Sequence, residues 1–118
     1  MEINQAIMSF SQSEKAKSAI IAASQTMELL AGLSAPEQMG AQRVIRMNLE
    51  MILQEIQLAK NVSEDDAWDG IEKTIEKALV MIDSGVAAES VVHLTQALSR
   101  ITSIGHRSMT VLREKGLL

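Results

Sequence analysis

The chain has 118 residues, 47% of them hydrophobic, with 15 acidic and 11 basic side chains that give a formal net charge of −4. This length suits one domain, residues 1–118, that can bury its own core. The absence of cysteine excludes disulfides and Cys-ligated zinc. Phe10 and Trp68 are the only aromatic residues, so the chain lacks the stacking platform that single-stranded nucleic acid needs, and we expect no nucleic-acid partner.

Targeting and membrane signals are weak throughout the chain. The first ten residues carry one charge, the negative Glu2, whereas a secretory signal begins with positive charge. The longest apolar runs, such as residues 79–82, are far shorter than the roughly 20 residues that span a bilayer. We therefore expect a cytoplasmic protein without a membrane span.

Start signals mark the beginnings of three of the four predicted helices. Ser11 is followed after three residues by Glu14, which is the spacing of a capping box. Ser34 has the same spacing to Glu37, with a proline inside the first turn, and Ser63 precedes three acidic residues that favour the positive end of a helix. These signals predict helices over residues 12–31, 35–61, 64–84 and 87–115.

The ends of the predicted helices agree with these starts. Gly32, Gly85 and Gly116 follow three of them, where a left-handed residue commonly ends a helix. Short loops between helices make neighbours antiparallel. The expected fold is therefore all-α, a four-helix up-down-up-down bundle.

Each predicted helix has one apolar line with a period near 3.5 residues, which is typical of the buried side of a bundle helix. In chain order these lines consist of Ala16, Ile20, Ala23, Met27 and Leu30; Ile45, Leu49, Ile52, Ile56 and Ala59; Trp68, Ile71, Ile75, Ala78 and Ile82; and Val91, Leu94, Leu98, Ile101, Gly105, Ser108 and Leu112.

The helix over residues 35–61 carries more apolar surface than a bundle needs. Val44, Met47, Met51 and Leu58 form a second stripe, about 100–160° around the helix from the first line. The combined apolar arc is roughly twice the 100° or so of an ordinary bundle helix. We interpret the second stripe as a homodimer interface, with core of the monomer and a groove for another protein as alternatives.

Two polar residues, Asn48 and Glu55, interrupt this arc and are seven residues apart. They are either rim positions that face water, or a polar pair that fixes helix register across the interface, as polar core positions do in coiled coils. The predicted interface therefore comprises Val44, Met47, Asn48, Met51, Glu55 and Leu58.

The first ten residues carry a short apolar face of their own. Ile3, Ala6, Ile7 and Phe10 have the spacing of one side of a two-turn helix. A helix that short does not form alone in water. We expect a separate N-terminal amphipathic segment that docks on the bundle or on a partner subunit.

No catalytic or metal-binding constellation emerges from the sequence. His93 and His106 are thirteen residues apart, which turns them about 220° from each other on a helix. Glu89 and His93 do not have the Glu-x-x-His spacing of helical di-iron proteins, which also requires several further ligands. We therefore predict no catalytic residue, no metal ligand and no cofactor.

One acidic cluster supports a competing hypothesis. Asp65, Asp69, Glu72, Glu76 and Asp83 share one side of the helix over residues 64–84. Carboxylates in that arrangement bind Mg²⁺ in all-helical nucleotide pyrophosphohydrolases. A solvated face of acids near a helix N-terminus is the simpler interpretation.

The favoured function is a non-enzymatic interaction or adaptor module that self-associates through the helix over residues 35–61. The chain also resembles flagellar and secretion chaperones at the level of class, in its small size, acidity and helical character. That resemblance implies a client helix held in the methionine-lined groove.

Overall fold

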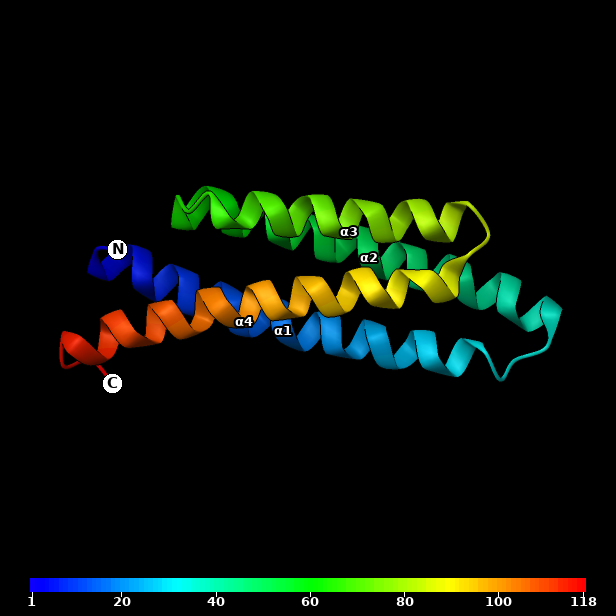
Figure 1. The fold of residues 1–118 in the computed structure, drawn as a ribbon, viewed down its shortest axis with the longest axis horizontal. Coiled ribbons are helices and arrows are strands. Elements are labelled where there is room, and N and C mark those ends of the chain that lie inside the picture. The colour runs from blue at the N-terminus through cyan, green and yellow to red at the C-terminus, as the bar shows by residue number, and fades with distance from the viewer.

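The computed structural model describes all 118 residues and contains four long helices and one short one. They are α1 (Ile3–Leu30), α2 (Ala35–Ser63), α3 (Ala67–Asp83), the 3-10 helix η1 (Ala87–Glu89) and α4 (Ser90–Glu114) (Figure 1). No strand is present. The predicted all-α fold is confirmed.

The first helix is longer than predicted, because the N-terminal segment is not separate from it. α1 runs without a break from Ile3, so Ser11 lies inside the helix. Ala6, Ser9 and Ser13 are all buried and continue the apolar line of α1 toward the N-terminus with small side chains. The Ser13 hydroxyl donates to the Phe10 carbonyl at 2.9 Å, so it forms a hydrogen bond without interrupting the helix.

The boundary between α1 and α2 is partly as predicted. Ser34 and Glu37 form the capping box at the start of α2, with the Ser34 backbone N–H donating to Glu37 Oε1 at 3.0 Å. Glycine was expected in the left-handed conformation at the end of α1. The capping residue is instead Ala31, in a right-handed conformation, and Gly32 has no positive φ.

The boundary between α2 and α3 lies later than predicted. Ser63 is the last residue of α2, and its buried hydroxyl donates to the Ala59 carbonyl instead of starting a new helix. Glu64 takes the left-handed conformation that ends α2, with φ of 52°. α3 begins at Ala67, whose backbone N–H donates to Asp65 Oδ1 at 2.9 Å.

The last helix begins with a tighter turn than predicted. Residues 87–89 are the 3-10 helix η1, and α4 follows directly from Ser90. Gly85 and Gly116 have φ of 79° and 73°, so the predicted left-handed ends after α3 and α4 are confirmed.

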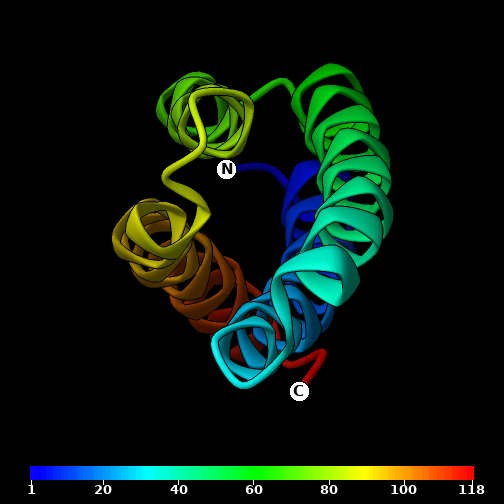
Figure 2. The same ribbon diagram turned by 90° about the vertical axis from the view of Figure 1, so that its right-hand side faces the viewer.

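The four helices form a ring in which each is antiparallel to the next, so the up-down-up-down topology is confirmed (Figures 1 and 2). α1 packs on α2 and α4, and α3 packs on the same two helices. The molecule measures 53 × 21 × 18 Å. In this ring each helix packs against two neighbouring helices, and its remaining side faces outward.

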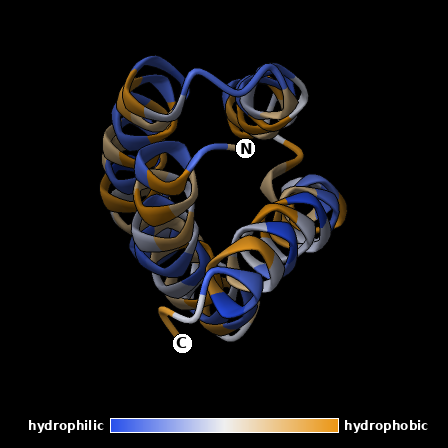
Figure 3. Cartoon of the chain, turned by 90° about the vertical axis from the view of Figure 1, so that its left-hand side faces the viewer, coloured by the Kyte–Doolittle hydropathy of each residue, from blue (hydrophilic) through white to orange (hydrophobic).

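The core consists of the predicted apolar lines, with one correction. Every predicted line residue of α1, α2 and α3 is buried. On α4, Leu98 and Val91 are only half-buried, whereas Ala97 and Ile104 are fully buried. Ile104 lines a depression together with Ala67 and Gly70 of α3, so the buried side of α4 includes residues that face α3 as well as residues that face α1. In Figure 3 the hydrophobic segments of α3 and α4 turn toward the space that the helices enclose.

Candidate functional site

The second apolar stripe of α2 lies on the outside of the bundle. The exposed fractions are 66% for Val44, 58% for Met47, 56% for Met51 and 45% for Leu58. The alternative that these side chains form part of the monomer core is therefore wrong. The reason is the register of α2: its first apolar line, which includes Ile45 and the other buried residues, already faces the bundle interior.

The two polar residues of the stripe occupy different environments. Asn48 is exposed, whereas Glu55 is half-buried and forms an ion pair with Lys15 of α1. The Lys15 Nζ to Glu55 Oε2 distance is 2.9 Å. Glu55 thus joins α2 to α1 within the subunit, and its charge is balanced there.

This ion pair shows which side of α1 borders the stripe. Met8, Ala22 and Leu29 are spaced from Lys15 by whole multiples of seven residues, which places them on the same side of α1. Met8 is 45% and Leu29 is 72% exposed. Sequence reasoning missed this half of the site, although the seven-residue spacing was a signal that could have found it.

A shallow depression of about 280 Å³ lies between the two helices. Ala19 and Ala22 line it from α1, and Asn48 and Met51 are among the residues that line it from α2. The small alanine side chains leave this hollow beside the larger side chains of the stripe. We call the whole surface the α1–α2 face; it comprises Met8, Lys15, Ala19, Ala22, Leu29, Val44, Met47, Asn48, Met51, Glu55 and Leu58.

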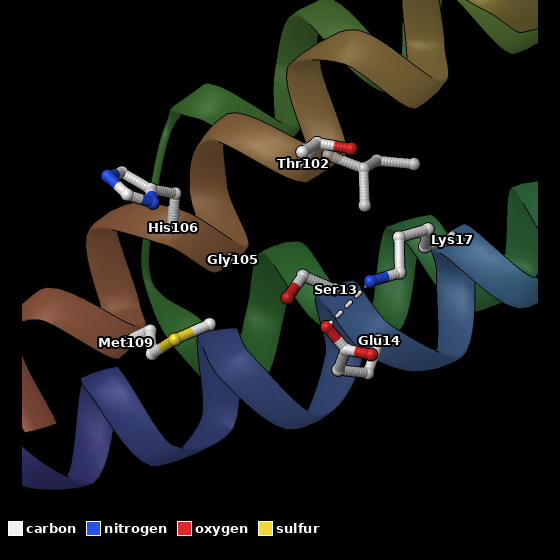
Figure 4. Close-up of a pocket in the computed structure, with 8 residues that line it drawn as sticks. Ser13, Glu14, Lys17, Thr102, Gly105, His106 and Met109 are labelled. Carbon is white, nitrogen blue, oxygen red and sulfur yellow. Dashed lines mark hydrogen bonds and ion pairs between the residues drawn. The ribbon is translucent and has the colours of Figure 1, made fainter. Parts of the chain in front are cut away.

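A second, smaller depression of about 130 Å³ lies between α1 and α4 (Figure 4). Ser13, Glu14 and Lys17 reach it from α1, and Gly105 and the exposed His106 are among those on α4. Lys17 and Glu14 pair with each other at 2.9 Å, and the Ser13 hydroxyl is bonded to its own helix. The charges of Lys17 and Glu14 are therefore balanced within the depression.

Three of the five acids in the predicted cluster, Asp65, Asp69 and Asp83, pair with cations of neighbouring helices, whereas Glu72 and Glu76 form no ion pair. Asp65 pairs with Arg107 at 3.0 Å, and Asp69 pairs with Lys60 at 2.6 Å. No group of three or more histidine, aspartate or glutamate side chains in the chain could hold a metal ion. The carboxylates therefore do not converge on one point as a Mg²⁺ site requires.

The third of these acids, Asp83, pairs with α2 through both of its carboxylate oxygens. Arg46 of α2 donates to both of its carboxylate oxygens, at 2.7 and 3.0 Å, and also pairs with Glu50. The hydrogen bond from Arg46 lowers the pKa of Asp83 below its ordinary value. This forked contact joins the first half of α2 to the C-terminal end of α3.

Fold and site together define an all-helical bundle with an outward apolar face on its first two helices. No helix has the length and apolar character needed to cross a membrane. Comparison of the sequence with protein-family models, curated proteins and solved structures found no match. The function therefore has to be argued from the α1–α2 face itself.

Proposed function

We propose that this protein is a non-enzymatic interaction module that forms a homodimer through the α1–α2 face. The observation that carries the proposal is the row of exposed apolar side chains on α2, from Val44 to Leu58, at 45–66% exposure. Contiguous exposed apolar surface of this kind is uncommon on monomeric proteins and marks interaction sites.

The charge distribution of the face supports the same proposal. Its only ionised side chains are Lys15 and Glu55, which already pair with each other. Interfaces are depleted of charge at their centre and enriched in methionine, as this face is with Met8, Met47 and Met51. A second subunit could cover it without burying an unpaired charge.

The size of the face suits a protein partner. From Met8 to Leu29 it extends about 32 Å along α1, and two neighbouring helices make it about 20 Å wide, which gives on the order of 600 Å² of projected area. A standard interface buries about 800 Å² of accessible surface per partner, and the accessible surface of packed side chains exceeds its flat projection.

Sedimentation velocity over a range of micromolar concentrations tests the proposal. The wild-type protein should sediment as a dimer, and Met47→Glu combined with Met51→Glu should dissociate it. Each new carboxylate would lose hydration without gaining an oppositely charged neighbour. It would also lie in the same interface as the corresponding carboxylate of the other subunit.

The matched control is Val80→Glu combined with Val92→Glu. These side chains are 55% and 60% exposed, on α3 and α4, outside the α1–α2 face. The control should remain dimeric, with the same helix content by circular dichroism. A wild type that is monomeric at every accessible concentration would overturn the proposal, as would a control that dissociates like the test variant.

A further inference from the structure

We infer that the second copy lies with its α2 against α1 of the first, so that Met51 of each subunit enters the depression that Ala19 and Ala22 line in the other. The inference rests on the proposed homodimer. It adds how the two faces fit together. In this arrangement the small side chains of Ala19 and Ala22 determine which side chain of the partner the face accepts.

The register of α1 against α2 can be read from their contacts. Lys15 is level with Glu55, since they pair at 2.9 Å, and Ala22 is level with Met51, since both line one depression. The helices are antiparallel, so later residues of α1 lie beside earlier residues of α2 (Figure 1). From the first pair to the second, α1 advances seven residues, about 10.5 Å, and α2 goes back four, about 6 Å, so the pairs define levels to within about one helical turn.

This correspondence extends the levels to both ends of the face. Leu29 is seven residues after Ala22 and is therefore level with Val44, seven residues before Met51. Met8 is likewise level with Val62, which is 39% exposed. With Val62 added, the α1–α2 face has four levels, each defined to within about one helical turn: three have an apolar residue on each helix, and one has the ion pair.

Consider a two-fold axis that runs parallel to the helices, just outside the face and midway between α1 and α2. It would place α2 of the second copy over α1 of the first without shifting any residue along the helices. Met51 of the second copy would then lie over Ala22, its Val44 over Leu29 and its Val62 over Met8. Large side chains meet small ones at the depression, and apolar side chains meet apolar ones at both ends.

The charged level is also matched by this axis. Glu55 of the second copy would lie over Lys15, so the two ion pairs would form one group of alternating charges. An axis perpendicular to the helices would instead place α2 on α2 and α1 on α1. At the level of Met51 it would set the methionines against each other and the alanines of α1 against alanines. The depression would then stay unfilled, which close packing disfavours.

The absence of cysteine from the chain allows a direct cross-linking test. Ala22→Cys and Met51→Cys are prepared separately, mixed, allowed to exchange subunits and oxidised mildly. A disulfide requires Cα atoms within about 7 Å, so it reports which residues face each other. The mixture should form a cross-linked dimer, and neither variant alone should do so.

Cross-linking of Met51→Cys with itself would overturn this arrangement, because it would place α2 on α2. Val80→Cys mixed with Met51→Cys is the control and should not cross-link, since Val80 is exposed on α3 outside the face. If the wild type does not dimerise, the proposed function itself fails, and sedimentation detects that outcome separately from the cross-linking pattern.

A filling substitution tests the role of the depression. Ala22→Phe should abolish dimer at concentrations where the wild type is dimeric, while leaving the helix content unchanged because Ala22 is exposed. Ser99→Phe, at an exposed position of α4, is the matched control and should leave the dimer intact. A fully dimeric Ala22→Phe variant would show that nothing from the partner enters the depression.

Discussion

Gly105 of α4 packs directly against Ser13 of α1, and replacing it tests how the bundle is packed. A Cβ atom added at Gly105 would lie 2.8 Å from Ser13 Oγ but 3.5 Å from Ser13 Cβ. The first distance requires something to move, whereas the second is an ordinary contact. The cost of Gly105→Ala should therefore depend on the hydroxyl of Ser13.

Two opposing terms set the size of the effect. Alanine in a helix interior is about 1 kcal/mol more favourable than glycine. Forcing an extra methyl into a packed interface costs about 1–3 kcal/mol, and Ser13 has little room to yield because it is buried. Gly105→Ala should lower the free energy of unfolding by about 1 kcal/mol in the wild type. In the Ser13→Ala background, where the hydroxyl is gone, the same change should raise it by about 1 kcal/mol.

Urea denaturation of the four proteins of this cycle, at one protein concentration, measures the two effects. The predicted result is a change of sign between the two backgrounds. If Gly105→Ala changes the free energy of unfolding equally with and without the Ser13 hydroxyl, the argument that this hydroxyl limits the packing of α4 on α1 is refuted.

Three further predictions concern the core, the N-terminus and one ion pair. Ile101→Ala should lower the free energy of unfolding by about 2–5 kcal/mol in urea denaturation, and Leu98→Ala by less, because Ile101 is fully buried and Leu98 half-buried. Deletion of residues 1–10 should lower both the helix content by circular dichroism and the melting temperature, since these residues form the first turns of α1 and pack on the bundle; unchanged values would contradict this. NMR titration should find the pKa of Asp83 below its ordinary range, and Arg46→Gln should restore it. Because the folded-state pKa is lowered, the stabilisation from this pair is present at neutral pH and is lost as the pH falls through that pKa.

Most of the fold could be predicted from the sequence because the apolar lines are regular. The predicted helix boundaries were wrong where a serine that looked like a helix cap lies inside a helix. Ser11 and Ser63 have the surroundings of helix caps, yet each lies within a helix, and Ser63 bonds to the Ala59 carbonyl. Serine side chains bond to the backbone at caps and inside helices alike, so the local pattern does not distinguish the two. Ser9 and Ser13, which flank Ser11, and Ser63 itself are buried, and that burial depends on packing between helices that the local pattern does not show.

The candidate site was half predictable for a related reason. The apolar residues of α2 were evident because they exceed what one core needs. On α1 the corresponding line contains Lys15 and Ala22, which do not read as apolar surface. The ion pair from Lys15 to Glu55, and the depression that Ala22 and Met51 line together, show that this side of α1 adjoins the stripe.

The closed ring of helices has a consequence for synthesis of the chain. Three of its four interfaces join consecutive helices, whereas the fourth joins α1 to α4. While α4 is still being translated, the ring stays open and the core residues of the first three helices remain accessible to water. At about 5–20 residues per second, the 25 residues of α4 take roughly 1–5 s to be added. During those seconds the nascent chain exposes more apolar surface than the finished protein ever does.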